Sequence, residues 1–596
     1  MHLLKRIYGL MIVSILIALT QSSLAESTPK YAPDRRVDIH HLTLDVIPDF
    51  EGHTLDGKTR IEFAPIAHPL TELRLNATDL DVFRVWSDAR IKDWTLTDTH
   101  VVIAFDPPIP ANQKKFVALF YRAQPKMGLY FRTAQNGYPA EDTHIYSQGE
   151  AHEAQHWYPN YDYPNERFTS EIICRVPQGM TVLSNGKIIS ETIDNTTGLK
   201  SVHWRQDKPH VNYLIALTAG YFKGLTDQYK NIPMGFYTPV SLFDMAKDSF
   251  KDTADMMGFF EQETGVPYPW HQYNQAVVWD FVAGGMENTT LTILTHRTLH
   301  PEEMEPLESS TGLVAHELAH QWFGDYVTCK DWANLWLNEG FATYYENLYS
   351  GHQLGRNQFL YNQYNDAQGL LRRSDPQVPV FYRAYADADE QFDGRAYQKG
   401  GWVLHMLRSQ LGEDLYRLCI KTYLERHALD TVETADLKAI IEEMSGRSLD
   451  RFFDQWIYTG GHPKLNVSYE WSPSTKLAKI TVKQTHARAQ KDKDILFHVP
   501  VSVRFHVAGE TVDHDMVIDQ AQQDFYVALP DEPNQVRFDP NLTVLADVTF
   551  KKPKAMLYAQ LADNNDIIGQ ILAARALQER DDTQTVLKLK EALNKA

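Results

Sequence analysis

Residues 316–320 read His316-Glu317-Leu318-Ala319-His320, and Glu339 follows after eighteen intervening residues. Residues four apart on a helix lie on one face, about 6 Å apart along the axis, so both imidazoles can converge on one Zn²⁺ ion. Glu317 lies about 100° round the helix and therefore flanks the metal rather than binding it. A catalytic zinc needs a third protein ligand and an open position, and Glu339 is the natural third ligand. This stretch predicts one Zn²⁺ per chain, held by His316, His320 and Glu339.

The alternative is a chance match of this motif on an ordinary amphipathic helix. Both segments carry apolar residues at helical spacing, so two buried helices would then each contain a charged group without a partner. That burial is costly, which favours the metal site. Ser309-Ser310-Thr311 offers an N-cap before the first helix. Asp325 and Glu346 are either hydrogen-bond partners of the metal ligands or ordinary surface and capping charges.

A second motif, Gly284-Gly285-Met286-Glu287-Asn288, lies upstream. Two glycines allow the backbone to approach a ligand closely, and a peptide can then add alongside as a further strand. Glu287 would lie beside such a peptide. On these residues alone, a β-turn with a solvated glutamate is the preferred interpretation.

Together the two motifs resemble those of the zinc aminopeptidases of the membrane alanyl aminopeptidase (aminopeptidase N) and leukotriene hydrolase family. Members of that family are gluzincins, with an H-E-x-x-H motif, eighteen residues and then a glutamate, and their second signature is G-x-M-E-N. Gly285 is similar to the leukotriene-hydrolase branch, since the family usually has alanine there. The resemblance covers about residues 30–550.

The resemblance and the patterns along the chain predict a multidomain α+β fold. The expected parts are a signal peptide (1–25), an N-terminal β domain (26–228), a thermolysin-like zinc catalytic domain (229–462), a small β-sandwich (463–550) and a short C-terminal helical tail (551–596). Helical patterns dominate from about 230 to 462, with 3.6-residue apolar spacing in 311–323, 335–348 and 400–411. The tail is expected to dock on the body, because short helical units rarely stand alone.

The resemblance also implies roles that spacing alone does not single out. Tyr397 lies in a Y-x-K-G segment similar to the one that holds the family's transition-state tyrosine, and Gln148-Gly149-Glu150 matches the family's Q-x-E segment. The implied catalytic residues are Glu317 as general base and Tyr397 as stabiliser of the oxyanion. The implied substrate-binding residues are Gln148, Glu150, Gly284, Gly285, Met286, Glu287 and Asn288.

These residues predict a zinc-dependent aminopeptidase that hydrolyses the N-terminal bond of peptides with a free N-terminus. Glu287 and Glu150 would bind the substrate's α-ammonium and fix which bond is cut. A rival hypothesis is a bifunctional enzyme that, like leukotriene hydrolase, also opens a lipid epoxide, since Asp389 lies eight residues before Tyr397, where that branch has an acidic residue. An endopeptidase is a second rival. An inactive binding protein is a third, although such a protein would have lost a ligand or the base, and none is lost.

The composition limits the class of protein. The chain has 596 residues, enough for about four domains, and its 43% hydrophobic and 23% charged residues exclude a disordered tail, a collagen and a polytopic membrane protein. The formal charge of −19 does not suit a nucleic-acid partner. Cys174, Cys329 and Cys419 allow at most one internal disulfide.

Residues 1–25 have the pattern of a secretory signal peptide. Lys5 and Arg6 precede an apolar stretch at 7–19, and Ser23-Leu24-Ala25 is a small-x-small cleavage site. That stretch is shorter than the ~20 residues of a spanning helix, which disfavours an uncleaved membrane anchor. We therefore expect an exported protein, periplasmic or secreted, without stable membrane insertion after cleavage. The oligomeric state and the preferred N-terminal residue of the substrate stay open.

Overall fold

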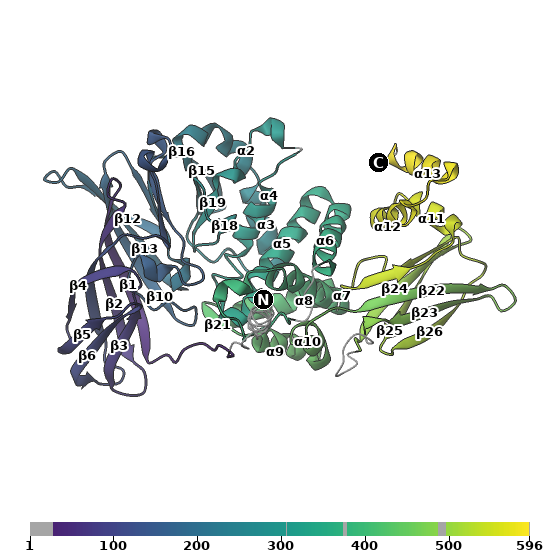
Figure 1. Ribbon diagram of the computed structural model, residues 1–596, viewed down its shortest axis with the longest axis horizontal. Coiled ribbons are helices and arrows are strands. Elements are labelled where there is room, and N and C mark those ends of the chain that lie inside the picture. The colour runs from purple at the N-terminus through teal and green to yellow at the C-terminus, as the bar shows by residue number, and fades with distance from the viewer. Residues whose placement is uncertain (1–27, 306, 373–377, 487–495, 595–596) are drawn as a thin grey trace, which may run out of the picture.

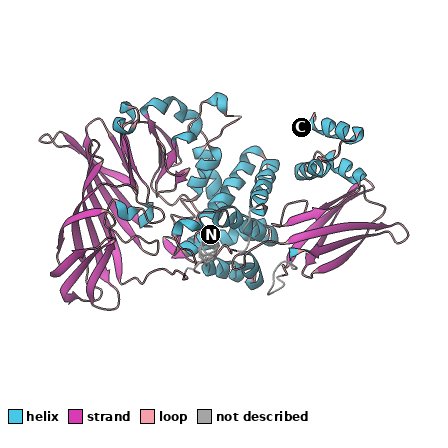
Figure 2. Ribbon diagram, viewed as in Figure 1, coloured by secondary structure: helices cyan, strands magenta, loops and turns pink. Residues whose placement is uncertain are grey.

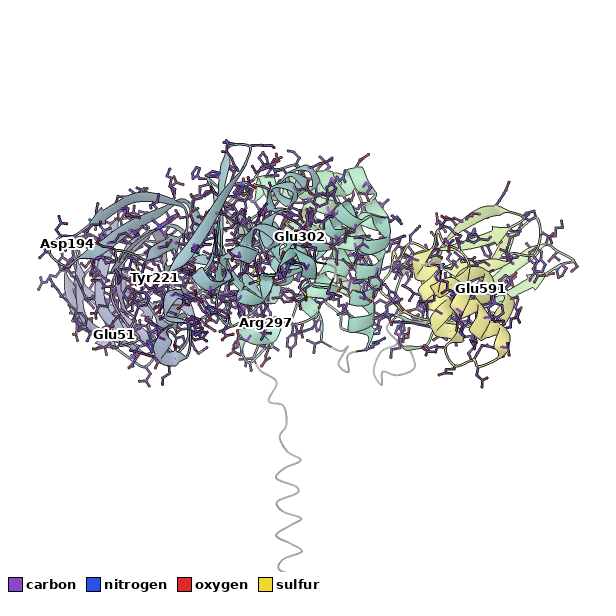
Figure 3. All side chains as sticks on the ribbon, turned by 90° about the horizontal axis from the view of Figure 1, so that it is seen from above. Glu51, Asp194, Tyr221, Arg297, Glu302 and Glu591 are labelled. Atoms are coloured by element: carbon purple, nitrogen blue, oxygen red, sulfur yellow. The ribbon has the colours of Figure 1, made fainter. Side chains whose placement is uncertain are left out.

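The computed structural model of the chain describes residues 28–305, 307–372, 378–486 and 496–594. Three parts lie in a row: a β-rich N-terminal part, a mainly helical middle part, and a second β-rich part with helices beside it (Figure 1 and Figure 2). The same order is seen from above in Figure 3. This is the predicted multidomain α+β architecture. The expected signal peptide, 1–25, lies outside the described residues, and within the described ranges no helix has both the length and the apolar character needed to cross a bilayer.

Three sheets build the N-terminal part. The largest has the order β12-β13-β10-β1-β2-β7-β4, and the other two have the orders β3-β6-β5 and β11-β14-β9-β8. Their strands are β1 (Val37–Asp49), β2 (Thr54–Pro65), β3 (Leu70–Asn76), β4 (Leu80–Ser87), β5 (Ile91–Leu96), β6 (His100–Ile109), β7 (Lys115–Ala123), β8 (Leu129–Arg132), β9 (His144–Ser147), β10 (Arg167–Pro177), β11 (Thr181–Ser184), β12 (Lys187–Ile193), β13 (Leu199–Val211) and β14 (Leu217–Gly220). Alternate residues of β1, such as Leu42, Leu44 and Val46, are buried, because successive side chains of a strand face opposite sides.

A five-stranded sheet of order β15-β16-β17-β19-β18 joins the N-terminal part to the helices. Its strands are β15 (Phe222–Tyr229), β16 (Ile232–Pro239), β17 (Tyr273–Val278), β18 (Gly285–Met286) and β19 (Leu291–Thr295). The sequence pattern favours helix from about residue 230, and for β16, β17, β18 and β19 it is wrong. β17 is buried at all six positions and runs parallel to β16 and β19, and such strands lack the alternation that identifies a strand. β18, the short strand of the G-x-M-E-N motif, forms the edge of the sheet.

Helices make up most of the middle part. They are α2 (Ala246–Phe250), α3 (Thr253–Thr264), α4 (Thr311–Ala319), α5 (Trp336–Leu354), α6 (Arg356–Leu371), α7 (Gly400–Leu411), α8 (Glu413–Arg426), α9 (Thr434–Ser445) and α10 (Asp450–Trp456), with a small sheet of β20 (Val327–Cys329) and β21 (Asp430–Val432). α7 has the predicted bounds. α4 ends before the predicted residue 323, because the chain turns back after His320 and Gly324 adopts a φ of 134°. α5 runs on past the predicted residue 348 to Leu354.

The approach of α7 to α5 depends on glycine. A Cβ atom on Gly340 of α5 would lie 2.8 Å from the backbone carbon of Gly400, and one on Gly400 would lie 3.0 Å from the Cα of Gly340. Only a residue without a side chain fits at such a contact. The contact places the π-helical turn Arg395–Lys399, which carries Tyr397, directly beside α5.

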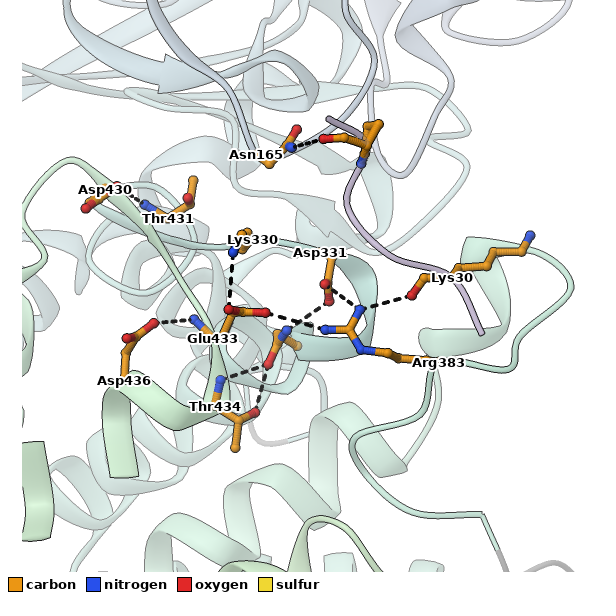
Figure 4. Close-up of polar contacts among 12 residues, drawn as sticks. Lys30, Asn165, Lys330, Asp331, Arg383, Asp430, Thr431, Glu433, Thr434 and Asp436 are labelled. Atoms are coloured by element: carbon orange, nitrogen blue, oxygen red, sulfur yellow. Dashed lines mark hydrogen bonds and ion pairs between the residues drawn. The ribbon is translucent and has the colours of Figure 1, made fainter. Parts of the chain in front are cut away.

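Arg383 fixes the segment that leads to this turn (Figure 4). Its Nη1 donates to Asp331 Oδ2 at 2.7 Å and to the carbonyl of Lys30 at 3.0 Å, and its Nη2 lies 3.4 Å from Glu433 Oε1. Because Asp331 is almost fully buried, this ion pair is shielded from water. The N-terminal segment, the 378–386 segment and the start of α9 are therefore held together beside the helices.

Two further sheets, of orders β26-β23-β22-β28 and β25-β24-β27, form the predicted C-terminal β part. The strands are β22 (Lys464–Ser472), β23 (Leu477–Gln484), β24 (Val499–Val507), β25 (Glu510–Ile518), β26 (Gln522–Ala528), β27 (Gln535–Phe538) and β28 (Asp547–Phe550), and the helical tail is α11 (Lys554–Leu561), α12 (Ile567–Leu577) and α13 (Thr583–Leu593). The tail docks on the body as expected, since Ile568 packs against Leu360 and Tyr364 of α6 and Arg575 donates to Gln368 at 2.9 Å.

The three cysteines, Cys174, Cys329 and Cys419, are all buried as free thiols, so none of them forms a disulfide.

Candidate metal and substrate site

The three predicted metal ligands meet at one point between α4 and α5. The Nε2 atoms of His316 and His320 lie 3.2 Å apart, and Glu339 Oε2 lies 3.2 Å from the first and 3.3 Å from the second. Ligand atoms ~2.0–2.1 Å from a tetrahedral zinc ion are about 3.3 Å from one another. The donor set and its spacing therefore fit zinc.

Neighbouring groups orient both imidazoles. His316 Nδ1 lies 3.3 Å from Glu346 Oε2, and His320 Nδ1 lies 2.8 Å from the carbonyl oxygen of Phe323. A metal-binding histidine commonly donates its other ring N–H in this way, which directs Nε2 to the metal. The sequence suggested Asp325 and Glu346 as hydrogen-bond partners of the metal ligands, and Glu346 is one. The Asp325 carboxylate forms no hydrogen bond with either imidazole, because the turn after α4 brings the Phe323 carbonyl there instead; only the backbone N–H of Asp325 donates, to the carbonyl of His320 at 3.0 Å.

The charges of the cluster stabilise one another. Burial would raise the pKa of Glu339, but His320 and His316 outweigh it and lower this pKa to about 2. Burial would likewise lower the pKa of His320, but Glu287 and Glu339 raise it to about 9. The carboxylates of the site therefore favour positive charge in its buried interior, which is the electrostatic property that a metal ion requires.

Glu317 lies beside the ligands without joining them. Its side chain is buried, and burial followed by the charges of Glu287 and Glu339 raises its pKa to about 8, although both histidines oppose the shift. A Cβ atom on Gly285 would lie 2.3 Å from Glu317 Oε1, so the edge strand β18 runs directly against this carboxyl group. A carboxyl group that exchanges a proton near neutral pH is suited to act as a general base.

Two more carboxylates lie next to the metal ligands. One oxygen each of Glu150, Glu287 and Glu339 lies within 4.8 Å of the other two. Glu287 is 3% exposed, so the interpretation of a solvated turn is wrong. Burial first, and then Glu287 and other carboxylates, raise the pKa of Glu150 well above its usual value. Oε1 of Glu150 and Oε1 of Glu287 are buried without a hydrogen-bond partner among the described residues, so this pair needs a donor from outside the chain.

The remaining predicted residues surround this pair, with one exception. Gln148 Nε2 donates to the carbonyl of Glu150 at 3.2 Å and contacts Met286 Sδ at 3.3 Å. The Tyr397 ring stacks on the His316 ring, with centroids 6.0 Å apart. Asn288 is fully buried and does not line the cavity, so the structure does not bring its side chain to the others.

All the predicted metal-binding, catalytic and substrate-binding residues except Asn288 line one cavity of about 630 Å³. The cavity also includes residues that the motifs did not point to: Ala151, Glu153, Val282, Ala283, Leu313 and Phe392. Glu153 and Asp389 additionally line a second cavity of about 910 Å³ on the N-terminal part, so the two cavities adjoin at these carboxylates. Glu153 lies three residues after Glu150, but no motif includes it, and its place in the wall depends on the fold.

The chain is similar to known peptidases in sequence. The model of the Peptidase family M1 domain matches residues 249–456, and that of the Peptidase M1 N-terminal domain matches residues 36–214. Aminopeptidase M1-C of Oryza sativa subsp. japonica is 28% identical over 461 residues, covering 74% of this chain and 51% of that protein. Aminopeptidase N of Streptomyces lividans is 27% identical over 481 residues, covering 75% and 53%. The chain thus spans about half the length of the curated relatives it matches.

The fold is similar to that of a solved aminopeptidase. The crystal structure of Legionella pneumophila aminopeptidase A in complex with aspartic acid superposes with a TM-score of 0.82 and 19% identity, covering 95% of this chain and 67% of that one.

Proposed function

The chain belongs to peptidase family M1, and on that premise we propose that it is a zinc-dependent aminopeptidase that removes the first residue from peptides. His316, His320 and Glu339 would hold the ion, since their ligand atoms lie 3.2–3.3 Å apart. When bound, zinc supplies a Lewis acid that lowers the pKa of a water molecule and polarises a carbonyl group.

Glu317 is proposed as the general base. It takes a proton from the attacking water molecule and later gives that proton to the leaving amine. Both transfers require a carboxyl group that is buried, correctly placed and able to exchange a proton near neutral pH. The raised pKa of Glu317 and its position between the metal ligands and β18 support this role.

Tyr397 is proposed to donate its hydroxyl hydrogen to the oxyanion that forms on the scissile carbonyl. Burial, followed by the charges of Glu339, Glu150 and Glu287, raises the pKa of this phenol well above its usual value. The hydroxyl group therefore keeps its proton and can act as a donor.

The Tyr397→Phe variant is expected to keep one zinc per chain and to lose about 10²–10³ in kcat, because it lacks one oxyanion donor. Metal analysis and steady-state kinetics on an aminoacyl coumarin measure the two effects. The Tyr382→Phe variant, which changes a tyrosine that does not line the catalytic cavity, is the control. An unchanged kcat for Tyr397→Phe would assign the donor role to another residue.

The observation that carries exopeptidase activity is the pair Glu150 and Glu287. A peptide's free α-amino group is an ammonium ion near neutral pH, with a pKa of ~7.7–8.0. It can donate to the unpartnered Oε1 atoms of both carboxylates, and it brings positive charge to a place where burial first, and then the charge of Glu287 on Glu150 and of Glu339 on Glu287, raise the pKa of both groups. A substrate held in this way presents only its first peptide bond to Glu317.

We therefore expect Glu287→Ala to lower kcat/KM on free-amine peptides by about 10- to 150-fold or more, the value of a charge-assisted hydrogen bond. N-acetylated peptides should be very poor substrates of the unmodified enzyme, because they lack the ammonium group. The Glu302→Ala variant, which removes an exposed carboxylate outside the cavity, should retain full activity. Efficient cleavage of N-acetylated peptides at internal bonds would instead establish an endopeptidase.

A further inference from the structure

The wall of the catalytic cavity next to the amine-binding pair is acidic. Glu153 lies three residues after Glu150. Its backbone N–H donates to the carbonyl of Gly149 at 3.0 Å, which closes a turn. Asp389 reaches the same place from the segment before Tyr397. Burial first, and then neighbouring charges that include Asp389, raise the pKa of both Glu150 and Glu153. Glu153 and Asp389 line the same cavity as Glu150 and Glu287, the pair that would hold the substrate's amine.

Neither of these two carboxylates is neutralised by the protein. Oε2 of Glu153 is fixed by the backbone N–H of Gly128 at 3.0 Å and by the hydroxyl group of Tyr130 at 2.8 Å. Among the ion pairs of the described residues, none includes Glu153 or Asp389. Carboxylates without an ion-pair partner at the edge of a cavity, here the fixed Glu153 and the exposed Asp389, attract a cation from outside the chain.

Several basic side chains near this wall have partners elsewhere, among them His156, whose Nδ1 lies 3.5 Å from Asp79 Oδ2. His152 Nδ1 lies 2.9 Å from the carbonyl of Asp162, and His152 Nε2 accepts the indole N–H of Trp332 at 3.0 Å, so the ring is neutral and has no free donor. Arg74 donates to Glu72 at 2.7 Å. Arg36 lines the larger cavity but not the catalytic one.

A third acceptor lies in the same cavity. Gln148 is 7% exposed, and its Oε1 is buried without a hydrogen-bond partner among the described residues, while its Nε2 is used by Glu150 and Met286. An unpartnered acceptor inside a cavity requires a donor from a ligand. The unpaired groups of this wall are thus acceptors.

We propose that the site prefers peptides whose first residue is lysine or arginine. This inference rests on the proposed function, because the α-ammonium between Glu150 and Glu287 places the side chain of the first residue beside Glu153 and Asp389. Ammonium and guanidinium groups only donate hydrogen bonds, so they match a wall that offers acceptors and negative charge. A first residue with a carboxylate side chain would be repelled by the same wall.

The test compares substrates of nearly equal shape that differ in charge. Zinc-loaded full-length protein is assayed with the arginine and citrulline 7-amido-4-methylcoumarins, and with the lysine and norleucine pair. We expect kcat/KM to be about 10-fold higher or more for the charged member of each pair, the scale of one charge-assisted hydrogen bond. The aspartate derivative should be the poorest substrate.

Two variants test whether Glu153 and Asp389 cause the preference for a cationic first residue. Asp389→Asn and Glu153→Gln should each lower the arginine-to-citrulline ratio at least about 3-fold, mainly through a higher KM for arginine, since each removes one charge from a partly hydrated site. Glu390→Gln changes a neighbouring exposed carboxylate that lines neither cavity and should leave the ratio unchanged. Because Glu153 also fixes the Gly128 loop, Asp389→Asn is the decisive variant if Glu153→Gln fails to fold.

The outcomes separate this inference from the proposed function. Equal turnover of arginine and citrulline substrates overturns the cationic preference but leaves the aminopeptidase intact. A preference that survives Asp389→Asn and Glu153→Gln overturns the role of this wall. If no aminoacyl substrate is hydrolysed, the proposed function fails. Calorimetric titration of the zinc-loaded protein with free L-arginine and L-citrulline then decides whether the wall selects the cation, and equal affinities overturn it.

Discussion

The His320→Ala variant is expected to contain no zinc and to show no measurable peptide hydrolysis, whereas the unmodified protein contains about one zinc per chain. His320 supplies one of three ligand atoms that lie 3.2–3.3 Å apart, and its ring is held by the Phe323 carbonyl. The variant removes a ligand from a three-ligand site and leaves Glu339 buried without its largest stabilising charge. Metal analysis after dialysis against zinc, followed by an aminopeptidase assay, measures both losses.

His352→Ala is the matched control. His352 lies in the last turn of α5 and its side chain is about half exposed, so that variant should keep its zinc and its activity. Removing zinc from the unmodified protein with a chelator should abolish activity, and adding zinc back should restore it. Full zinc occupancy in purified His320→Ala protein would show that the ligand set is wrong.

The Glu317→Gln variant should keep its zinc and lose about 10²–10⁴ in kcat, the usual contribution of a general base. Glutamine has the size of glutamate but cannot accept a proton near neutral pH. Because Glu317 is not among the three metal ligands, the substitution leaves the metal site complete. The experiment measures zinc content and kcat separately. The His320→Ala variant cannot distinguish the two effects, because it is expected to lose both zinc and activity.

Glu308→Gln serves as the control for this variant, since Glu308 is exposed and precedes α4 without lining the cavity. If Glu317→Gln lost its zinc, Glu317 would be a ligand rather than a base. If it kept full activity, the proton would be accepted by another group.

The β structure of the chain was predictable only where strands have one face in water. Alternation identifies β1, with Leu42, Leu44 and Val46 buried, because its period follows directly from backbone geometry. The same pattern is missing from β17, which is buried on both faces between parallel neighbours. The apolar spacing of the sequence therefore could not predict the sheet that places Gly285 beside Glu317. The glycine motif itself could be recognised in the sequence.

The sequence by itself predicted the three side chains that meet between α4 and α5, His316, His320 and Glu339. His316 and His320 share a helix face through the 3.6-residue repeat alone, and the position of Glu339 follows from the motif spacing. The tertiary structure alone decided what surrounds them: that Glu287 is buried beside Glu150, and that Glu153 and Asp389 meet in one wall. Local periodicity carries information over a turn of helix, whereas contacts between residues more than 100 positions apart depend on how whole sheets and helices pack.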